Sequence, residues 1–389
     1  MKNYVTFFAL LLGQGLLGSV VSLLTLTLPL LGKQLAPVAW LMSLPLAASV
    51  LGAMAMVGYA SKVMAKYGRR RGFLFSSGLG LVASLLAILA VYGRYFWLLV
   101  LAAFVFGLAT VFNQYYRFAV AEIFADPIKT RRCTAFLIGS GIIGGVIGPL
   151  LAAKGQDLIM GYPFLGAFMM SLCLFLAAGL VQLAIVLPHE QKMVAIHCRP
   201  PLSAMPKSVL LATFSCAIGF ALMTLMMNAT PLVMHQHHYD VQQSARVLQW
   251  HFIAMYAPAL ALPFLLEKIK ITTLIQLGAI CFLLGSLAIY ALPEYGGYLV
   301  CLIAVGMGWS LMFSGGTLLL NAYPDNPQQW QGLNATATYL ANTLAALLAG
   351  GLLYWSAGWL AIQVLNVSVI IGFLFYSCSP VKYSRSTLK

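Results

Sequence analysis

The sequence predicts an all-α integral membrane protein with twelve transmembrane helices in two six-helix halves. Of its 389 residues, 61% are hydrophobic and only 8% are charged, whereas roughly a quarter of the residues in a soluble domain are charged. Twelve apolar stretches alternate with charges, prolines and glycines, and one longer polar segment separates the sixth stretch from the seventh. Such a chain cannot cover its surface with polar groups, so the lipid bilayer is its predicted partner.

Each apolar stretch is long enough to cross a bilayer, which takes about 20 apolar residues per helix. The predicted spans are residues 4–31, 37–60, 72–92, 96–121, 134–153, 163–187, 208–233, 243–266, 272–292, 298–322, 333–355 and 358–378. The first run is too long for the apolar core of a signal peptide, which has roughly 7–15 residues. The predicted organisation is a first half over 1–187, a cytoplasmic linker over 188–207, a second half over 208–378 and a cytoplasmic tail over 379–389.

The basic residues predict the orientation of the chain. With a cytoplasmic N-terminus, 17 of the 22 lysines and arginines lie in cytoplasmic segments, and four lie outside, namely Lys33, Arg94, Lys154 and Arg246. Cytoplasmic loops of membrane proteins carry such an excess, so both termini are predicted to be cytoplasmic. Because these loops account for the net charge of +14, no nucleic-acid partner is expected.

Neither an enzyme nor a cofactor site is expected. The seven cysteines form no CxxC pair. The loop HQHHYD holds His235, His237, His238 and Asp240, but it is short and fits no standard metal spacing, so a solvated loop is predicted. The motifs GxSxG, HExxH and GxxxxGK are all absent from the sequence, which argues against hydrolytic chemistry and against ATP-driven pumping by this chain.

The loop after the second span, SKVMAKYGRRRGF, resembles the signature loop G-x-L-x-D-R-x-G-R-R of the major facilitator superfamily. Aligned on Gly68, the basic residues are Lys66, Arg69 and Arg70, while Ser61 and Ala65 replace the family's glycine and aspartate. Six spans later, PFLLEKIK offers Glu267 and Lys268 in the equivalent loop. The recurrence of the loop at this interval carries the resemblance.

Two further stretches support the same family. In GSGIIGGVIGPLL, Gly144, Gly148 and Pro149 resemble the antiporter motif of efflux members; ordinary packing of small residues is the alternative. The stretches YYRFA, QWHFIAMYAP and GWSLMFSGGTLLLNAY resemble a bacterial branch whose substrates are mostly unassigned. The efflux pattern is incomplete, because Ala103 stands at its arginine position in the fourth span and the first span has no acid.

The resemblance implies the major facilitator fold and a monomeric secondary transporter in the bacterial inner membrane. Its cargo would be a small organic molecule, moved by alternating access, with proton-linked export preferred. An uptake permease or a transporter of siderophore-type chelates is the alternative, and a membrane enzyme or sensor is a remote one. The resemblance also implies that Glu122 pairs with Arg69 or Arg70 when the inner side is closed, unless Glu122 is an ordinary interfacial acid.

Arg117 is the one basic residue counted on neither side of the membrane, and it lies within the predicted fourth span, in NQYYRFAVAEIF. A charge at the bilayer centre costs roughly 2.5–3.5 kcal/mol, and such residues usually face a cavity or a partner. Three interpretations remain open: snorkelling to the inner interface, binding of an anionic group in the cavity, or a structural ion pair. None of the eight acids falls in the centre of a span, so an anionic or zwitterionic substrate is predicted to supply the counter-charge.

Further polar residues within the spans are candidates for the substrate site. His251 is also a candidate proton carrier, although a hydrogen-bonded buried histidine is the alternative. The predicted set beside Arg117 consists of Gln14, Asn113, Tyr116, Gln249, His251 and Asn342.

Overall fold

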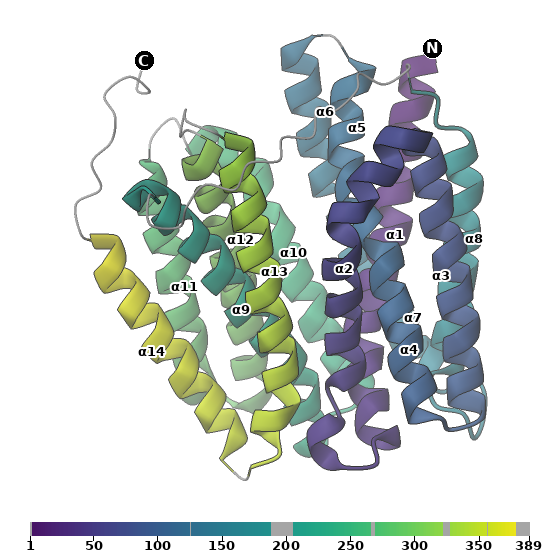
Figure 1. Ribbon diagram of the computed structural model, residues 1–389. Helices are drawn as coiled ribbons and strands as arrows, with labels where there is room; N and C mark the ends of the chain where they lie inside the picture. Colours follow the sequence, from purple (N-terminus) through teal and green to yellow (C-terminus); the bar gives the residue numbers. More distant parts are fainter. Residues whose placement is uncertain are drawn as a thin grey trace.

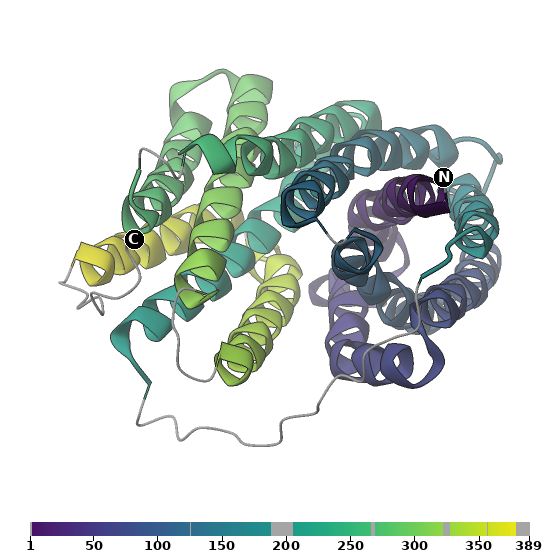
Figure 2. The same ribbon diagram turned by 90° about the horizontal axis from the view of Figure 1, so that it is seen from above.

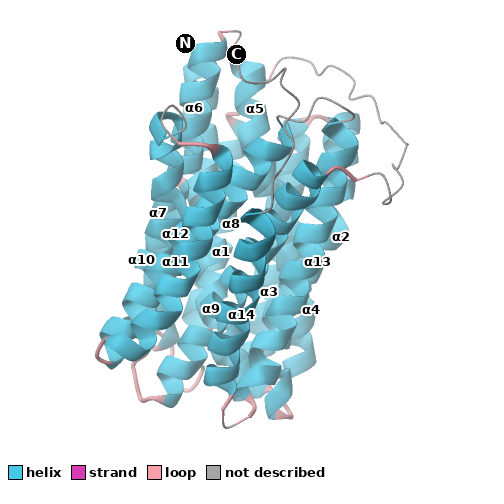
Figure 3. Cartoon of the chain, turned by 90° about the vertical axis from the view of Figure 1, so that its left-hand side faces the viewer, coloured by secondary structure: helices cyan, strands magenta, loops and turns pink. Residues whose placement is uncertain are grey.

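The computed structural model describes residues 2–124, 126–187, 205–265, 269–321, 327–355 and 357–378, apart from some side chains within the helices. Every regular element in these ranges is a helix (Figure 3). Residues 188–204 of the linker predicted over 188–207, and the tail over 379–389, lie outside the described residues.

The first half of the chain forms α1 (Lys2–Leu35), η1 (Ala39–Leu41), α2 (Leu44–Tyr67), α3 (Arg69–Tyr92), α4 (Phe96–Thr110), η2 (Val111–Tyr115), α5 (Tyr116–Ile123), α6 (Pro127–Gly139), α7 (Gly141–Gln156) and α8 (Leu165–Leu183). The second half forms α9 (Lys207–Gln236), α10 (Val241–Leu265), α11 (Ile271–Ala291), α12 (Glu294–Asn321), α13 (Pro327–Leu353) and α14 (Gly358–Cys378). Each predicted span therefore corresponds to one long helix or to one interrupted helix.

Eleven helical stretches in the described residues are long and apolar enough to cross a membrane. The predicted eighth span, which corresponds to α10, is not among them, and its sequence includes Arg246, Gln249 and His251. Three predicted spans are interrupted. The second divides into η1 and α2, residues 96–121 divide into α4, η2 and α5, and the fifth span divides into α6 and α7 at Ser140. The first span also runs four residues beyond its predicted end, which places Lys33 in its last turn.

The helices gather into two bundles that lie side by side (Figures 1 and 2). In the first bundle α1 packs on α7, α2 on α4, and α3 on both α4 and α8. In the second bundle the packing partners are α9 with α13, α10 with α12, and α11 with both α12 and α14. These pairs are related by a shift of six spans along the chain. The bundles meet where α7 faces α10, α2 faces α13 and α1 faces α9.

Glycines allow α1 and α7 to approach closely within the first bundle. A Cβ atom on Gly144 would lie 2.6 Å from the carbonyl carbon of Gly18, and one on Gly148 would overlap Ser19 and Ser22. The hydroxyl of Ser22 donates a hydrogen bond of 2.6 Å to the carbonyl oxygen of Gly144. The contact is consistent with the packing interpretation of the glycine motif, in which small residues let helices touch through their backbones.

Candidate substrate site between the two bundles

The fourth span is interrupted in the middle by the 3-10 segment η2. Two hydrogen bonds to neighbouring helices support the interruption: Ser76 donates to the carbonyl oxygen of Ala109 at 2.9 Å, and the Tyr115 hydroxyl donates to that of Val57 at 2.7 Å. Asn113 in η2 is half-buried, and its Oδ1 atom has no hydrogen-bond partner among the described residues. A 3-10 stretch within a long helix often marks a functional hinge.

A direct hydrogen bond connects this interruption to the second bundle. The Gln114 side chain, which is exposed, donates from Nε2 to the hydroxyl of Tyr339 on α13 at 2.6 Å. The bond spans 225 residues of sequence. It places η2 and the middle of α13 on opposite sides of the seam between the bundles, where a substrate of an alternating-access protein would bind.

Next to Tyr339, α13 carries a row of polar side chains with unsatisfied atoms. Asn334, Thr338 and Asn342 recur every fourth residue, so they share one helical face. The oxygens Asn334 Oδ1, Thr338 Oγ1 and Asn342 Oδ1 are buried and have no hydrogen-bond partner among the described residues. A buried unsatisfied polar group costs about 1–3 kcal/mol. We call these three residues the α13 polar row, and water or a substrate would satisfy it.

We expect Tyr339→Phe to loosen the seam between the bundles. Loss of one hydrogen bond weakens the contact by about 0.5–1.5 kcal/mol, so the population in which η2 and α13 separate should rise by roughly 2- to 10-fold. The change would be measured as the distribution of distances between spin labels at exposed Lys62 of α2 and exposed Thr336 of α13, by pulsed electron paramagnetic resonance. Gln114→Ala should have the same effect, and the double variant should show no larger shift in population than either single variant. Additive shifts would instead show that the two side chains act independently. Tyr59→Phe, at an exposed position on α2, is the control.

Arg117 is the second residue of α5 and follows the interruption directly; its side chain lies outside the described residues. The adjacent Tyr116 is fully buried, contrary to its predicted place on the substrate surface. Its ring stacks on Phe73 at a centroid distance of 4.2 Å, and its hydroxyl accepts a hydrogen bond of 2.8 Å from Gln182. Gln182 in turn accepts one of 2.9 Å from Ser77. Tyr116 is therefore a core residue of the first bundle in this conformation.

The other predicted site residues are divided between the seam and the core. Gln249 donates from Nε2 to the carbonyl oxygen of Val146 at 2.8 Å, which joins α10 to α7 across the seam. His251 is fully buried, and its Nδ1 lies 2.7 Å from the carbonyl oxygen of Leu302 on α12. Since a carbonyl oxygen only accepts, Nδ1 carries the proton, and Nε2 has no partner among the described residues. This arrangement fits the alternative of a hydrogen-bonded buried histidine. Gln14 is half-buried on α1.

A third contact across the seam involves Ser43, which was not among the predicted site residues. Ser43, immediately before α2, donates to the carbonyl oxygen of Leu347 at 3.3 Å and accepts from the backbone N–H of Gly350 at 3.1 Å. It joins the start of α2 to the C-terminal part of α13, at the end of the molecule opposite the start of α1 (Figure 1). Nothing in the local sequence distinguishes this serine, because its partners lie about 300 residues away.

Comparison with known proteins decides the family. Residues 10–350 match the sequence profile of the Major Facilitator Superfamily. The chain belongs to this superfamily. It is therefore a multi-pass membrane protein and a secondary transporter of a small molecule, not an enzyme.

Two relatives illustrate where the chain stands in the superfamily. It is 27% identical over 347 residues to the riboflavin transporter RfnT of Brucella anthropi, covering 88% of this chain and 87% of the relative. It is 24% identical over 358 residues to the uncharacterized MFS-type transporter YdeG of Bacillus subtilis, covering 87% and 82%.

Solved structures confirm the major facilitator fold. The D-xylose-proton symporter aligns with a TM-score of 0.75 at 12% identity over 97% of each chain. The human organic anion transporter MFSD10 (TETRAN) aligns with a TM-score of 0.69 at 14% identity, over 96% of this chain and 99% of that chain. At such identities the likeness concerns the fold alone.

The superfamily's signature loop is a tight turn between α2 and α3. Gly68 ends α2 and begins α3 with a φ of +88°, a conformation that L side chains rarely adopt, which explains the glycine at this position. Lys66 is exposed and its Nζ lies 5.1 Å from the centroid of the Tyr67 ring. Arg69 is half-buried and Arg70 is exposed.

The predicted ion pair of Glu122 with Arg69 or Arg70 remains a prediction. The side chain of Glu122, the expected partner of Arg69 or Arg70, lies outside the described residues, as do Glu267 and Lys268 of the second loop. Pro149 lies inside α7, one residue after Gly148.

Proposed function

We propose that this transporter moves a small anionic or zwitterionic organic molecule across the bacterial inner membrane by alternating access, as a proton-linked exporter. The observation that carries the proposal is the seam site, where Gln114 meets Tyr339 beside the unsatisfied α13 polar row. Arg117 follows η2 directly and supplies the positive charge that a carboxylate would neutralise. Opening and closing of the seam on alternate sides would expose this site to each aqueous phase in turn.

A flavin is the second candidate cargo. It is favoured by the name of the riboflavin transporter to which the chain is 27% identical. The second bundle offers matching ring surfaces, because Trp309 and Phe313 of α12 stack at a centroid distance of 5.2 Å and an angle of 11°, with Phe220 of α9 beside them. The indole Nε1 of Trp309 has no partner among the described residues. A planar heterocycle could stack on these rings and accept that N–H.

Reconstituted vesicles would separate these possibilities. Purified protein in sealed liposomes would be offered labelled dicarboxylates, amino acids and riboflavin, with the pH gradient imposed in either direction. We expect accumulation of an anionic or zwitterionic compound on the side from which protons leave, as antiport requires. Accumulation of riboflavin alone would select the second candidate, and transport that is indifferent to the pH gradient would overturn the proton linkage.

The proposed orientation makes a direct prediction about labelling. In a variant without native cysteines, a cysteine at exposed Lys66 should resist a membrane-impermeant thiol reagent in intact cells, because the turn between α2 and α3 would be cytoplasmic. A cysteine at exposed Lys154, near the end of α7, should react under the same conditions. The reverse pattern would place both termini outside the cell.

A further inference from the structure

A cavity of about 660 Å³ lies at the end of the molecule where α1, α7 and α9 finish. It is lined from the first bundle by Lys33 of α1 and Gln156 of α7, and from the second by the end of α9 and the turn into α10. Its volume is in the range of small-molecule sites, roughly 300–1,000 Å³. The cavity is separate from the α13 polar row, and the proposed orientation puts it on the outer side.

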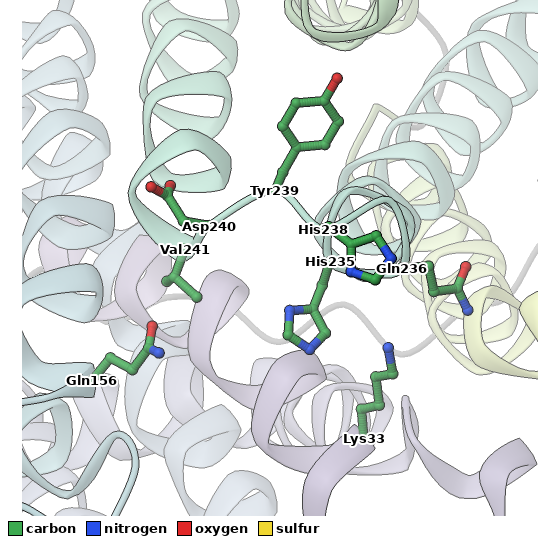
Figure 4. A pocket seen from close by; sticks show the side chains of 8 residues that line it. All are labelled: Lys33, Gln156, His235, Gln236, His238, Tyr239, Asp240 and Val241. Carbon is green, nitrogen blue, oxygen red and sulfur yellow. The ribbon is translucent and has the colours of Figure 1, made fainter.

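The side chains of Lys33, His235 and His238 around this cavity present nitrogen atoms that have no hydrogen-bond partner among the described residues. Figure 4 shows that Lys33 and the imidazole of His235 extend into the same space, with His238 beside them. Among the described residues, no ion pair or hydrogen bond engages the side chain of Lys33, which is half-buried. The nearby acid, Asp240, is engaged elsewhere: its Oδ1 accepts from the backbone N–H of Gln243 at 2.6 Å, and the Gln243 side chain accepts from the Asp240 N–H at 3.0 Å.

The reciprocal contact of Asp240 and Gln243 is a capping box at the start of α10. Figure 4 shows the Asp240 carboxylate directed away from Lys33. The positive charge in the cavity therefore lacks an internal counter-ion among the described residues.

The turn that carries His238 is held in an uncommon conformation. His238 has a φ of +63°, in the left-handed region, which few residues other than glycine adopt. Its neighbours fix it: the Tyr298 hydroxyl lies 3.0 Å from Nδ1 of His237, and the Tyr239 ring packs on Tyr295 and Tyr298 at 6.0 Å. Strained residues that surrounding structure holds in place cluster at ligand sites.

We infer that this cavity is a second binding site, an outer vestibule that takes the carboxylate of a small organic anion between Lys33 and the imidazoles of His235 and His238. The inference rests on the proposed function, since it assigns the vestibule to the same anionic cargo on its way to or from the seam site. Because the lining comes from both bundles, a bound anion would bridge them and stabilise the arrangement in which this end is closed.

The test measures binding of succinate by calorimetry, at constant ionic strength, to protein in phosphatidylcholine nanodiscs. An Arg117→Gln background removes the central arginine, so that binding in the vestibule is read separately from the proposed transport. We expect Lys33→Gln to raise the dissociation constant about 10-fold and Lys33→Arg to preserve binding. His238→Asn, which keeps the left-handed backbone accessible, should weaken binding as well. Lys154→Gln is the matched control, because Lys154 is an exposed lysine in the last turn of α7 outside the cavity lining.

Three outcomes would overturn the inference. Equal weakening by Lys33→Gln and Lys154→Gln would show non-specific attraction to surface charge, and unchanged binding in Lys33→Gln would show that the vestibule does not hold the anion. Loss of succinate binding on replacing zwitterionic phosphatidylcholine with phosphatidylglycerol would assign the site to an anionic lipid headgroup. If the protein binds succinate in the vestibule but transports no anion, the proposed function is refuted and the inferred binding site is retained.

Discussion

Arg117→Lys is expected to reduce transport about 10- to 100-fold while the protein still inserts and folds. Lysine keeps the charge but loses the planar fork that holds a carboxylate through two parallel hydrogen bonds. A hydrogen bond to a charged group contributes about 1.5–3 kcal/mol, which corresponds to that range. The arginine lies immediately after the interruption of the fourth span, where η2 presents Asn113 and Gln114. Initial rates in reconstituted vesicles, normalised to the amount of folded protein, would measure the effect.

The matched control is Arg132→Lys. Arg132 is exposed on α6, so a lysine there should leave the rate unchanged. Arg117→Gln should be at least as defective as Arg117→Lys, since it removes the charge as well. If both Arg117 variants transport at the normal rate, the arginine is an anchor that reaches the membrane interface, and the anionic cargo loses its main support.

Gly144→Ala and Gly148→Ala are expected to destabilise the protein by about 1–3 kcal/mol each, the usual effect of overpacking. The added methyl group on Gly144 would meet the backbone of Gly18 and Ser19 at 2.6–2.8 Å. Backbone atoms cannot rotate away as a side chain can, so α1 and α7 would have to separate. The midpoint of thermal unfolding and the monodisperse yield after solubilisation would both fall.

Gly78→Ala provides the comparison, because a Cβ atom on Gly78 of α3 would meet nothing within 4 Å. That substitution should be neutral or slightly stabilising. Equal stability of Gly144→Ala and Gly78→Ala would contradict the packing role. A Gly144→Ala protein with normal stability but no transport would instead support a direct role in transport for the stretch that resembles the antiporter motif.

The long helices could be predicted from the sequence because the bilayer imposes a local rule. A span needs about 20 apolar residues wherever it lies in the chain, so a window of sequence is enough to find it. The interruption at η2 follows no such rule. The run NQYY contains neither proline nor glycine, and the interruption is supported by hydrogen bonds from Ser76 on α3 and to Val57 on α2.

The roles of individual side chains could likewise be predicted from the sequence only in part. Polarity within a span selected Asn113, Gln249 and Asn342 as substrate-binding candidates, which they remain; in the structure Gln249 bonds across the seam, and Asn113 and Asn342 each hold an unsatisfied oxygen. The same criterion also selected Tyr116, which the structure places in the core. Polarity within a span did not select Gln182 or Tyr339, whose hydrogen-bond partners come from other spans.

The sequence by itself determined that this chain crosses the membrane many times and belongs among the transporters, because hydropathy and the loop around Gly68 are local properties. Only the tertiary structure decided which polar groups meet at the seam, that the glycine motif is where α1 and α7 touch, and that Lys33 shares a cavity with His235. Each of these depends on residues more than 100 positions apart. Their proximity follows from helix packing, in which both faces of a contact must fit, and no single segment specifies both faces.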